Sequence, residues 1–210
     1  MQNQPARGKF IVFEGIDGAG KTTQISLLTA WLKSRGRAVH TTAEPTNSTI
    51  GGIIRDALEG LTEKTACEMT ALFVADRIFH NTNPVSGIRN ILASGQDVIC
   101  DRYYYSTLAY QGSMTDYDWV SALNLQCPDI LKPDLCVFLD LKPEVSLDRI
   151  ARNRSVTEIY ENIDTLKKVR DQFFNVFEQL KSRDRICVID AGGTVEEVSE
   201  SIIRAVSDLF

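Results

Sequence analysis

Long apolar runs are missing from this sequence. No stretch approaches the roughly 18 uninterrupted apolar residues that a membrane-spanning helix needs. The opening residues, MQNQPARGKF, also lack the apolar core of a secretory signal peptide. These absences exclude membrane-spanning transporters, channels and receptors, and they predict a cytoplasmic protein with no membrane partner.

Cysteine is sparse, and its spacing is irregular. The chain has five cysteines, an odd number, and no Cys-x-x-Cys pair. Three of them, Cys100, Cys136 and Cys187, lie in apolar stretches that are typical of strands. We therefore predict the reduced, buried thiols of an intracellular protein.

An excess of positive charge is also missing. There are 28 acidic and 23 basic side chains, so the net charge is −5. The molecule as a whole would repel a polyanion such as DNA. We expect no nucleic-acid partner, and any phosphate must be bound by a local site.

Internal repeats, low-complexity tracts and linkers rich in proline, glycine or serine are absent too, so the 210 residues predict a single domain, residues 1–210. Short apolar runs alternate with helical patterns, which favours an α/β fold with a parallel sheet covered on both faces. The expected strands are residues 10–13, 38–42, 98–100, 135–139 and 186–189. Three glycines are expected to end helices, namely Gly36, Gly60 and Gly95.

The stretch FIVFEGIDGAGKTTQISLL, residues 10–28, contains a phosphate-binding motif. It matches Gly-x-x-x-x-Gly-Lys-Ser/Thr between an expected strand and an expected helix, and a chance match has a probability on the order of 1%. Glycines let backbone N–H groups converge on an anion at the helix N-terminus. The motif predicts ATP or GTP, with Lys21 on the outer phosphates and Thr22 on Mg²⁺, unless it is merely a glycine-rich turn. The expected nucleotide-binding residues are Gly15, Ile16, Asp17, Gly18, Ala19, Gly20, Lys21, Thr22 and Thr23.

Polar residues also follow the third expected strand. In VICDRYYYSTLAYQG, Asp101 and Arg102 stand at its carboxyl end, where open α/β sheets bind ligands. Asp101 suits metal-bound water and Arg102 suits a second phosphate; a surface ion pair is the alternative. In ALFVADRIFHN, Phe73 and Arg77 share a helix face and could stack on and hydrogen-bond a nucleobase. For these two, the alternatives are core packing and a solvated face.

Five sequence blocks resemble the successive motifs of the thymidylate kinase family, whose members make dTDP from dTMP and ATP. They are FEGIDGAGKTTQ, EP, LFVADR, DRYYYSTLAYQG and PDLCVFLDLKPE, and they span most of residues 8–190. The resemblance implies a three-layer P-loop kinase fold with a five-stranded parallel sheet flanked by helices and a small lid, at about residues 149–162. It also implies phosphoryl transfer from Mg-ATP to dTMP in dTTP biosynthesis, by a homodimer.

The resemblance further implies roles for single residues. Asp17 would bond the sugar 3′-hydroxyl or order the acceptor phosphate and its metal. Phe73 would stack on thymine, and Arg77 would donate to its O4. Arg102 would grip the 5′-phosphate while Asp101 orients magnesium or its water. The remaining implied substrate contacts are Ser106 and Thr107 near the base N3 edge, Tyr110 where it crowds a ribose 2′-hydroxyl, Gln111, and the turn Glu44-Pro45.

One position departs from the family's pattern. Ala43 stands where arginine is frequent, which removes a cation from the acceptor pocket, and Arg55 is the candidate to compensate. On the adenine side, the resemblance implies that backbone around Ala191 and Gly192 frames the base.

The implied chemistry needs no general base. A phosphate monoester has a second pKa of about 6, so the acceptor is already largely dianionic at neutral pH. The difficulty is the charge on the transferring group, which calls for Mg²⁺ and cations held in line. The phosphate loop contains no arginine, so we expect at least one of Arg149, Arg152 and Arg154 in the lid to close over ATP; the alternative is a solvated helix flank. The implied catalytic residues are Lys21, Asp17, Arg102, Arg152 and Arg154, with Arg149 on ATP.

Other functions stay open at this point. A kinase for UMP, dUMP, a nucleoside or a small metabolite would need a different base pocket, although dUMP lacks only a methyl group worth about 1–3 kcal/mol. A nucleotide-dependent switch would share the phosphate loop, but the Asn-Lys-x-Asp stretch of such GTPases is absent. A degenerate kinase retained for binding is disfavoured because Lys21, Thr22, Asp101 and Arg102 are all present.

Overall fold

The computed structural model describes residues 6–153 and 162–210. Its centre is a five-stranded parallel sheet with the strand order β2-β3-β1-β4-β5. The prediction of a parallel sheet is confirmed, and each strand lies within one residue of its expected bounds at either end. The strands are β1 (Phe10–Glu14), β2 (Val39–Ala43), β3 (Asp97–Asp101), β4 (Leu135–Asp140) and β5 (Ile186–Asp190).

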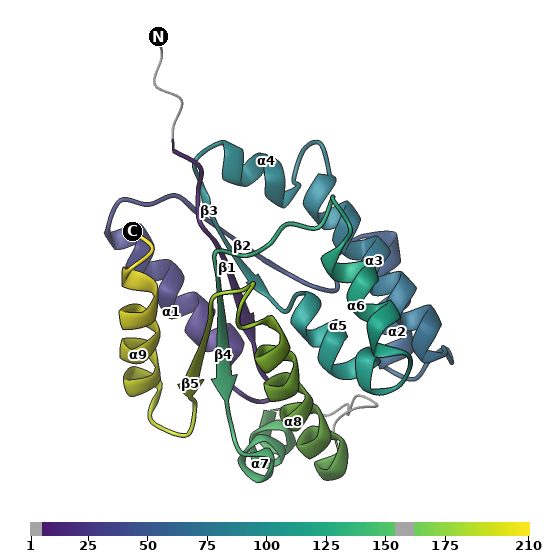
Figure 1. Cartoon of the computed structure of the whole chain (residues 1–210). Coiled ribbons are helices and arrows are strands. Elements are labelled where there is room, and N and C mark those ends of the chain that lie inside the picture. The colour runs from purple at the N-terminus through teal and green to yellow at the C-terminus, as the bar shows by residue number, and fades with distance from the viewer. Residues whose placement is uncertain (1–5, 154–161) are drawn as a thin grey trace.

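Helices cover both faces of this sheet, so the three-layer prediction is also confirmed (Figure 1). The glycines predicted to end helices follow α1, α2 and α4. The helices are α1 (Lys21–Ser34), α2 (Thr49–Leu58), α3 (Ala66–Thr82), α4 (Ile88–Ala93), α5 (Tyr104–Tyr110), the 3₁₀ turn η1 (Gln111–Ser113), α6 (Tyr117–Leu125), α7 (Pro143–Asn153), α8 (Ile163–Leu180) and α9 (Val195–Ser207).

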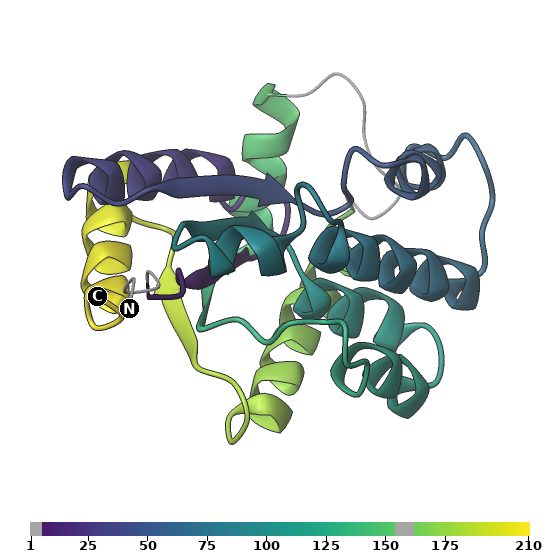
Figure 2. The same ribbon diagram turned by 90° about the horizontal axis from the view of Figure 1, so that it is seen from above.

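Alternation along β1 divides the core between the two faces. Ile11 and Phe13 pack with α1 and α9, whereas Phe10 and Val12 pack with the helices of the opposite face, including α4, α5 and α8. Figure 2 shows α1 and α9 grouped on one side of the molecule, away from α2 to α6. All of β1 is buried, which is typical of a central parallel strand.

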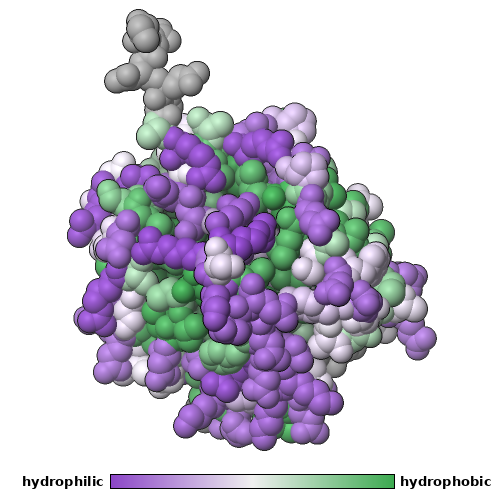
Figure 3. Space-filling view, in the orientation of Figure 1, coloured by the Kyte–Doolittle hydropathy of each residue, from purple (hydrophilic) through white to green (hydrophobic). Residues whose placement is uncertain are grey.

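The two edge strands are less well covered than the centre. No residue of β2 is fully buried, and Val188 of β5 is 45% exposed. Figure 3 shows a mostly hydrophilic face that is interrupted by smaller hydrophobic areas. Within the described ranges, no helix has both the length and the apolar character that a membrane crossing requires.

All five cysteines are free thiols. Cys100 and Cys136 are buried in the central strands, as predicted, and Cys127 and Cys187 are partly buried. The prediction of buried thiols is wrong for Cys67, which is exposed because it lies in the first turn of α3, where that helix begins at the surface.

The lid expected at residues 149–162 begins inside α7, which extends to Asn153. Arg149 therefore stands on a regular helix. The side chain of Arg152, and Arg154 altogether, lie outside the described part of the chain.

Candidate active site

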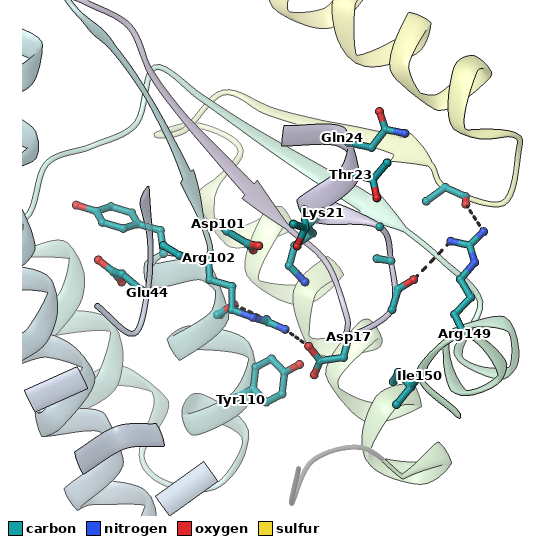
Figure 4. Close-up of a pocket in the computed structure, with 18 of the residues that line it drawn as sticks. Asp17, Lys21, Thr23, Gln24, Glu44, Asp101, Arg102, Tyr110, Arg149 and Ile150 are labelled. Carbon is teal, nitrogen blue, oxygen red and sulfur yellow. Dashed lines mark hydrogen bonds and ion pairs between the residues drawn. The ribbon is translucent and has the colours of Figure 1, made fainter. Parts of the chain in front are cut away.

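A cavity of about 680 Å³ opens at the carboxyl ends of β1 and β3. The described residues that were predicted for the site line it, apart from Gly15 and Ile16 at the base of the phosphate loop and Gly192 after β5. Figure 4 shows Asp17, Lys21 and Arg102 pointing into one shared space. The predicted residues on the lining are Asp17 to Thr23, Glu44, Pro45, Phe73, Arg77, Asp101, Arg102, Ser106, Thr107, Tyr110, Gln111, Arg149 and Ala191.

The phosphate loop connects Glu14 of β1 to Lys21 at the start of α1. Gly18 has a φ of 74°, and a Cβ atom there would lie 2.9 Å from the Ser146 carbonyl oxygen, so no larger residue fits this turn. Lys21 is buried, and its Nζ donates to the Gly15 carbonyl oxygen at 3.1 Å. Burial and the nearby Arg102 lower the pKa of Lys21, while neighbouring carboxylates oppose that shift. The hydrogen bonds that Lys21 Nζ makes to backbone carbonyl oxygens can be exchanged for contacts with a bound anion.

Arg102 faces the loop from the end of β3. Its Nη2 donates to Asp17 Oδ1 at 2.5 Å, and its Nη1 donates to Ser106 Oγ at 3.0 Å. Burial opposes the charge on this guanidinium, but acidic neighbours led by Asp17 outweigh burial and keep the pKa of Arg102 raised. Its Cζ also lies 5.7 Å from the centroid of the Tyr110 ring. Lys21 and Arg102 thus bring two cationic groups into the cavity that Asp17 also lines.

The environment of Asp101 indicates whether this site fits a divalent cation. Its Oδ1 is buried and has no hydrogen-bond partner among the described residues, which is unfavourable for a carboxylate unless a ligand satisfies it. Thr22 lines the same cavity from the first turn of α1. Mg²⁺ is commonly held by one or two protein oxygens together with phosphates and water, so these two residues fit Mg²⁺.

Arg77 lies at the other end of the cavity and is only 1% exposed, so the alternative of a solvated face is wrong. Its Nε donates to Glu44 Oε2 at 2.9 Å, and its Nη2 pairs with the same oxygen at 2.7 Å. Nη2 also donates to Thr107 Oγ1 at 3.1 Å, and Nη1 donates to Asn124 Oδ1. The guanidinium is therefore held in one plane by three side chains from three segments.

Several supporting residues were not predicted from the sequence. His80 Nδ1 lies 3.0 Å from Glu44 Oε1 and so holds the carboxylate that fixes Arg77. The available signal was spacing, because His80 follows Arg77 by three residues and shares its helix face. Asn124 gave no such signal, since it reaches Arg77 only through the packing of α6 on α3.

The Glu44-Pro45 turn lies beside these groups, and its peptide bond is cis. Asp76, in the LFVADR block, accepts hydrogen bonds from the backbone N–H and the hydroxyl of Thr46 at 2.7 and 2.6 Å. Arg55 Nη1 donates to the Thr46 carbonyl oxygen at 2.6 Å, and both Arg55 and Ala43 line the cavity. That Arg55 supplies the missing cation stays a prediction.

Arg149 of α7 reaches both the phosphate loop and the segment after β5. Its Nη1 lies 3.5 Å from the Gly18 carbonyl oxygen, and its Nη2 donates to the Ala191 carbonyl oxygen at 3.3 Å (Figure 4). The segment after β5, predicted to frame a base, therefore lies against the phosphate loop through this arginine.

Comparisons with known proteins agree with this geometry. A family model described as thymidylate kinase matches residues 13–202. The probable thymidylate kinase of Pyrococcus horikoshii is 37% identical over 208 residues, covering 95% of this chain and 96% of that protein. The thymidylate kinase of Caldicellulosiruptor saccharolyticus is 37% identical over 215 residues, covering 97% and 98%.

A solved structure, that of thymidylate kinase from Candida albicans, has a TM-score of 0.81 at 24% sequence identity. It covers 97% of this chain and 92% of its own, and so shares the fold. Since the family model spans most of the sequence and the relatives are similar over nearly their whole length, the chain belongs to the thymidylate kinase family.

Proposed function

We propose that this protein transfers the terminal phosphoryl group of ATP to the 5′-phosphate of dTMP, giving dTDP and ADP in the supply of dTTP. The names of the matched family and relatives support dTMP as the acceptor. The observation that carries the proposal is the presence of two cations in one cavity: Lys21 in the phosphate loop, and Arg102 at the end of β3, which is paired with Asp17.

The donor nucleotide occupies the phosphate-loop end. Residues Gly15 to Thr23 wrap its phosphates, Lys21 exchanges its carbonyl partners for phosphate oxygens, and Arg149 and Ala191 meet the nucleotide from the other side. Thr22 and Asp101 would hold Mg²⁺, which would neutralise charge on the phosphates. The orphaned Asp101 Oδ1 supports this assignment.

The acceptor occupies the other end, with its phosphate on Arg102 and its base near Arg77. Arg77 has five N–H donors, and the described contacts leave one N–H on Nη1 without a protein acceptor. A single donor suits the O4 carbonyl of thymine or uracil and meets the amino group of cytosine unfavourably. Phe73 stacks on the base, and the remaining substrate contacts are Asp17, Glu44, Pro45, Ser106, Thr107, Tyr110 and Gln111.

Transfer proceeds by alignment and charge stabilisation. The acceptor phosphate is a dianion at neutral pH because its second pKa is about 6, so it attacks without a protein base. Lys21 and Arg102 stabilise charge on the transferring group, and Asp17 keeps Arg102 in place. Arg152 and Arg154 are the candidates for a further cation that closes over ATP.

The test is ADP release from Mg-ATP with dTMP, dUMP, UMP, dCMP, AMP and thymidine as sole acceptors. A strong preference for dTMP is the expected result. Comparable rates with all monophosphates would keep the kinase and discard the base assignment. No turnover with any acceptor would favour a nucleotide-binding switch instead.

We also propose that the protein is a cytoplasmic homodimer without nucleic-acid or membrane partners. The resemblance of the whole chain to its family supports this proposal. Light scattering on the purified protein tests the proposed homodimer, because a mass near twice the 23.4 kDa of one chain is expected.

A further inference from the structure

Glu14 is a completely buried carboxylate next to the active site. It is the last residue of β1 and pairs in register with Phe138 of β4. Burial raises its pKa to about 6, although Arg102, Ser106, Tyr103 and Lys21 all act to lower it. The side chain is therefore ionised at neutral pH in a place where an unneeded charge would be unfavourable.

The Glu14 carboxylate accepts three hydrogen bonds from the start of α5. Its Oε1 accepts from the backbone N–H groups of Tyr103 at 2.8 Å and Ser106 at 3.1 Å. Its Oε2 accepts from the Ser106 hydroxyl at 2.6 Å. Tyr103 itself, the N-cap residue of α5, gives no side-chain cap, so Glu14 caps this helix from a different strand.

Ser106 passes this restraint on to Arg102. A hydroxyl has one proton, and Ser106 gives it to Glu14, so a lone pair is left for the N–H of Arg102 Nη1 at 3.0 Å. Asp17 holds Nη2 of the same guanidinium at 2.5 Å. The Arg102 backbone lies in the left-handed region, with a φ of 65°, which is uncommon for a residue other than glycine.

We propose that Glu14 is a positioning residue for the acceptor phosphate: through Ser106 it fixes the orientation of the Arg102 guanidinium. The proposal rests on the proposed function, in which Arg102 binds the 5′-phosphate of dTMP. Glu14 is not among the residues that line the cavity, so it acts on the acceptor phosphate through Ser106 and Arg102.

The groups that face Glu14 are consistent with this role. Two cations act on it, Lys21 from α1 and Arg102 from the end of β3, and both favour its ionised form. The other titratable neighbours are weak acids that are neutral at neutral pH, namely Tyr110 of α5, Cys100 of β3 and Cys136 of β4. Asp17 and Asp101 also act on Lys21 and Arg102, so loss of the Glu14 charge removes one of three carboxylates that balance these two cations.

Glu14→Gln is the test, because glutamine keeps the shape of the side chain. Its carbonyl oxygen can still accept from Tyr103 and Ser106, but its amide nitrogen faces Ser106 Oγ as a donor. Ser106 Oγ then accepts from the glutamine amide instead of donating to a carboxylate, so the direction of its hydroxyl proton, and of the lone pair that faces Arg102, is no longer fixed. We expect kcat/KM for dTMP to fall about ten- to hundredfold while KM for ATP changes little.

Three comparisons separate positioning from a merely structural role. Ser106→Ala should cause the same dTMP-specific loss, and Glu14→Gln with Ser106→Ala should be no worse than Ser106→Ala alone. Asp97→Asn changes another fully buried carboxylate, at the opposite end of β3, and should lower stability without a dTMP-specific loss. Additive losses in the double variant would overturn the proposal.

The pH profile gives a second readout. The ratio of kcat/KM for dTMP, wild type over Glu14→Gln, cancels the titration of dTMP itself. It should fall toward one as the pH drops below about 6, where Glu14 is protonated. A ratio that stays constant with pH would overturn the proposal.

Parallel assays of the wild type distinguish the two possible failures. If the wild type does not phosphorylate dTMP, the proposed function fails and this inference fails with it. If the wild type is active and Glu14→Gln matches it, only the positioning role is wrong. If Glu14→Gln does not fold, Ser106→Ala decides alone, and an unchanged kcat/KM for dTMP in that variant contradicts the proposal.

Discussion

Arg102 Nη2 lies 2.5 Å from Asp17 Oδ1, so an ion pair joins the end of β3 to the middle of the phosphate loop (Figure 4). The two residues come from separate strand ends, 85 positions apart in the sequence. In the proposed function, an acceptor phosphate on Arg102 would therefore lie next to the loop that is proposed to hold the donor phosphates. This contact couples the two halves of the site.

Lys21→Ala should reduce transfer by about 10²–10³-fold or more while the protein stays folded. Lys21 Nζ bonds only carbonyl oxygens among the described residues, so its loss leaves no buried carboxylate without its ion-pair partner. Lys33→Ala, at the exposed end of the same helix, is the matched control. Steady-state rates and circular dichroism would measure both properties, and wild-type turnover in Lys21→Ala would refute the phosphate-loop assignment.

The sheet was predictable because its signal is local. The alternating contacts of Phe10, Ile11, Val12 and Phe13 with two helix layers follow from a run of apolar residues between turn signals. Strand order could not be predicted in this way, because the alternation of strands and helices does not fix it. Only the resemblance to a family gives information about strand order.

The lining residues of the site were predictable where motifs name them, but their supports were not. Asn124 bonds Arg77 across 47 residues, and Ser106 bonds Glu14 across 92. Such pairs depend on which helices pack together in the fold. In the sequence, Glu14 is only a polar residue at the end of an apolar stretch, as at many strand ends. Glu14 in FIVFE therefore gave no sign of its role before the fold was known.

Asp101→Asn should raise the Mg²⁺ concentration needed for half-maximal transfer by about tenfold or more. The substitution keeps the size of the side chain and removes the charge from a buried oxygen that has no described protein partner. Asp140→Asn is the control, because Asp140 ends the neighbouring strand β4 but pairs with Arg170 and does not line the cavity. Titration of Mg²⁺ at fixed ATP measures the effect, and identical curves for Asp101→Asn and the wild type would contradict the assignment.

Arg77→Leu should lower the free energy of unfolding by about 3–5 kcal/mol, because it leaves the buried Glu44 carboxylate without its arginine. Arg89→Leu is the matched control, since it breaks an exposed pair with Asp129 and should change stability little. Denaturant unfolding measures both. Equal effects in the two variants would show that the Arg77–Glu44 pair is not a buried ion pair in solution.

Tyr110→Ala should narrow the preference for dTMP over ribothymidine monophosphate by about an order of magnitude. The Tyr110 ring is buried against Phe173 and near Arg102, on the wall of the cavity where the sugar is expected. Tyr110→Phe keeps the ring and should keep the preference. The comparison needs kcat/KM for both acceptors, and an unchanged ratio in Tyr110→Ala would remove this residue from sugar selection.

The pH dependence of stability should reveal the cost of keeping Glu14 ionised. Its folded pKa is raised by burial to about 6 from an ordinary value of 4.5, so the folded state binds the proton more tightly than the unfolded state. The stabilising contribution is therefore complete below about pH 4.5 and is lost as the pH rises through about 6. Between about pH 5 and pH 8 this amounts to about 1 kcal/mol. Glu14→Gln lacks this titration, so its stability relative to the wild type should increase by that amount over the same range in denaturant unfolding. If the difference between the two proteins does not change with pH, Glu14 does not titrate in this range, and its charge is held by stronger contacts than those to Tyr103 and Ser106.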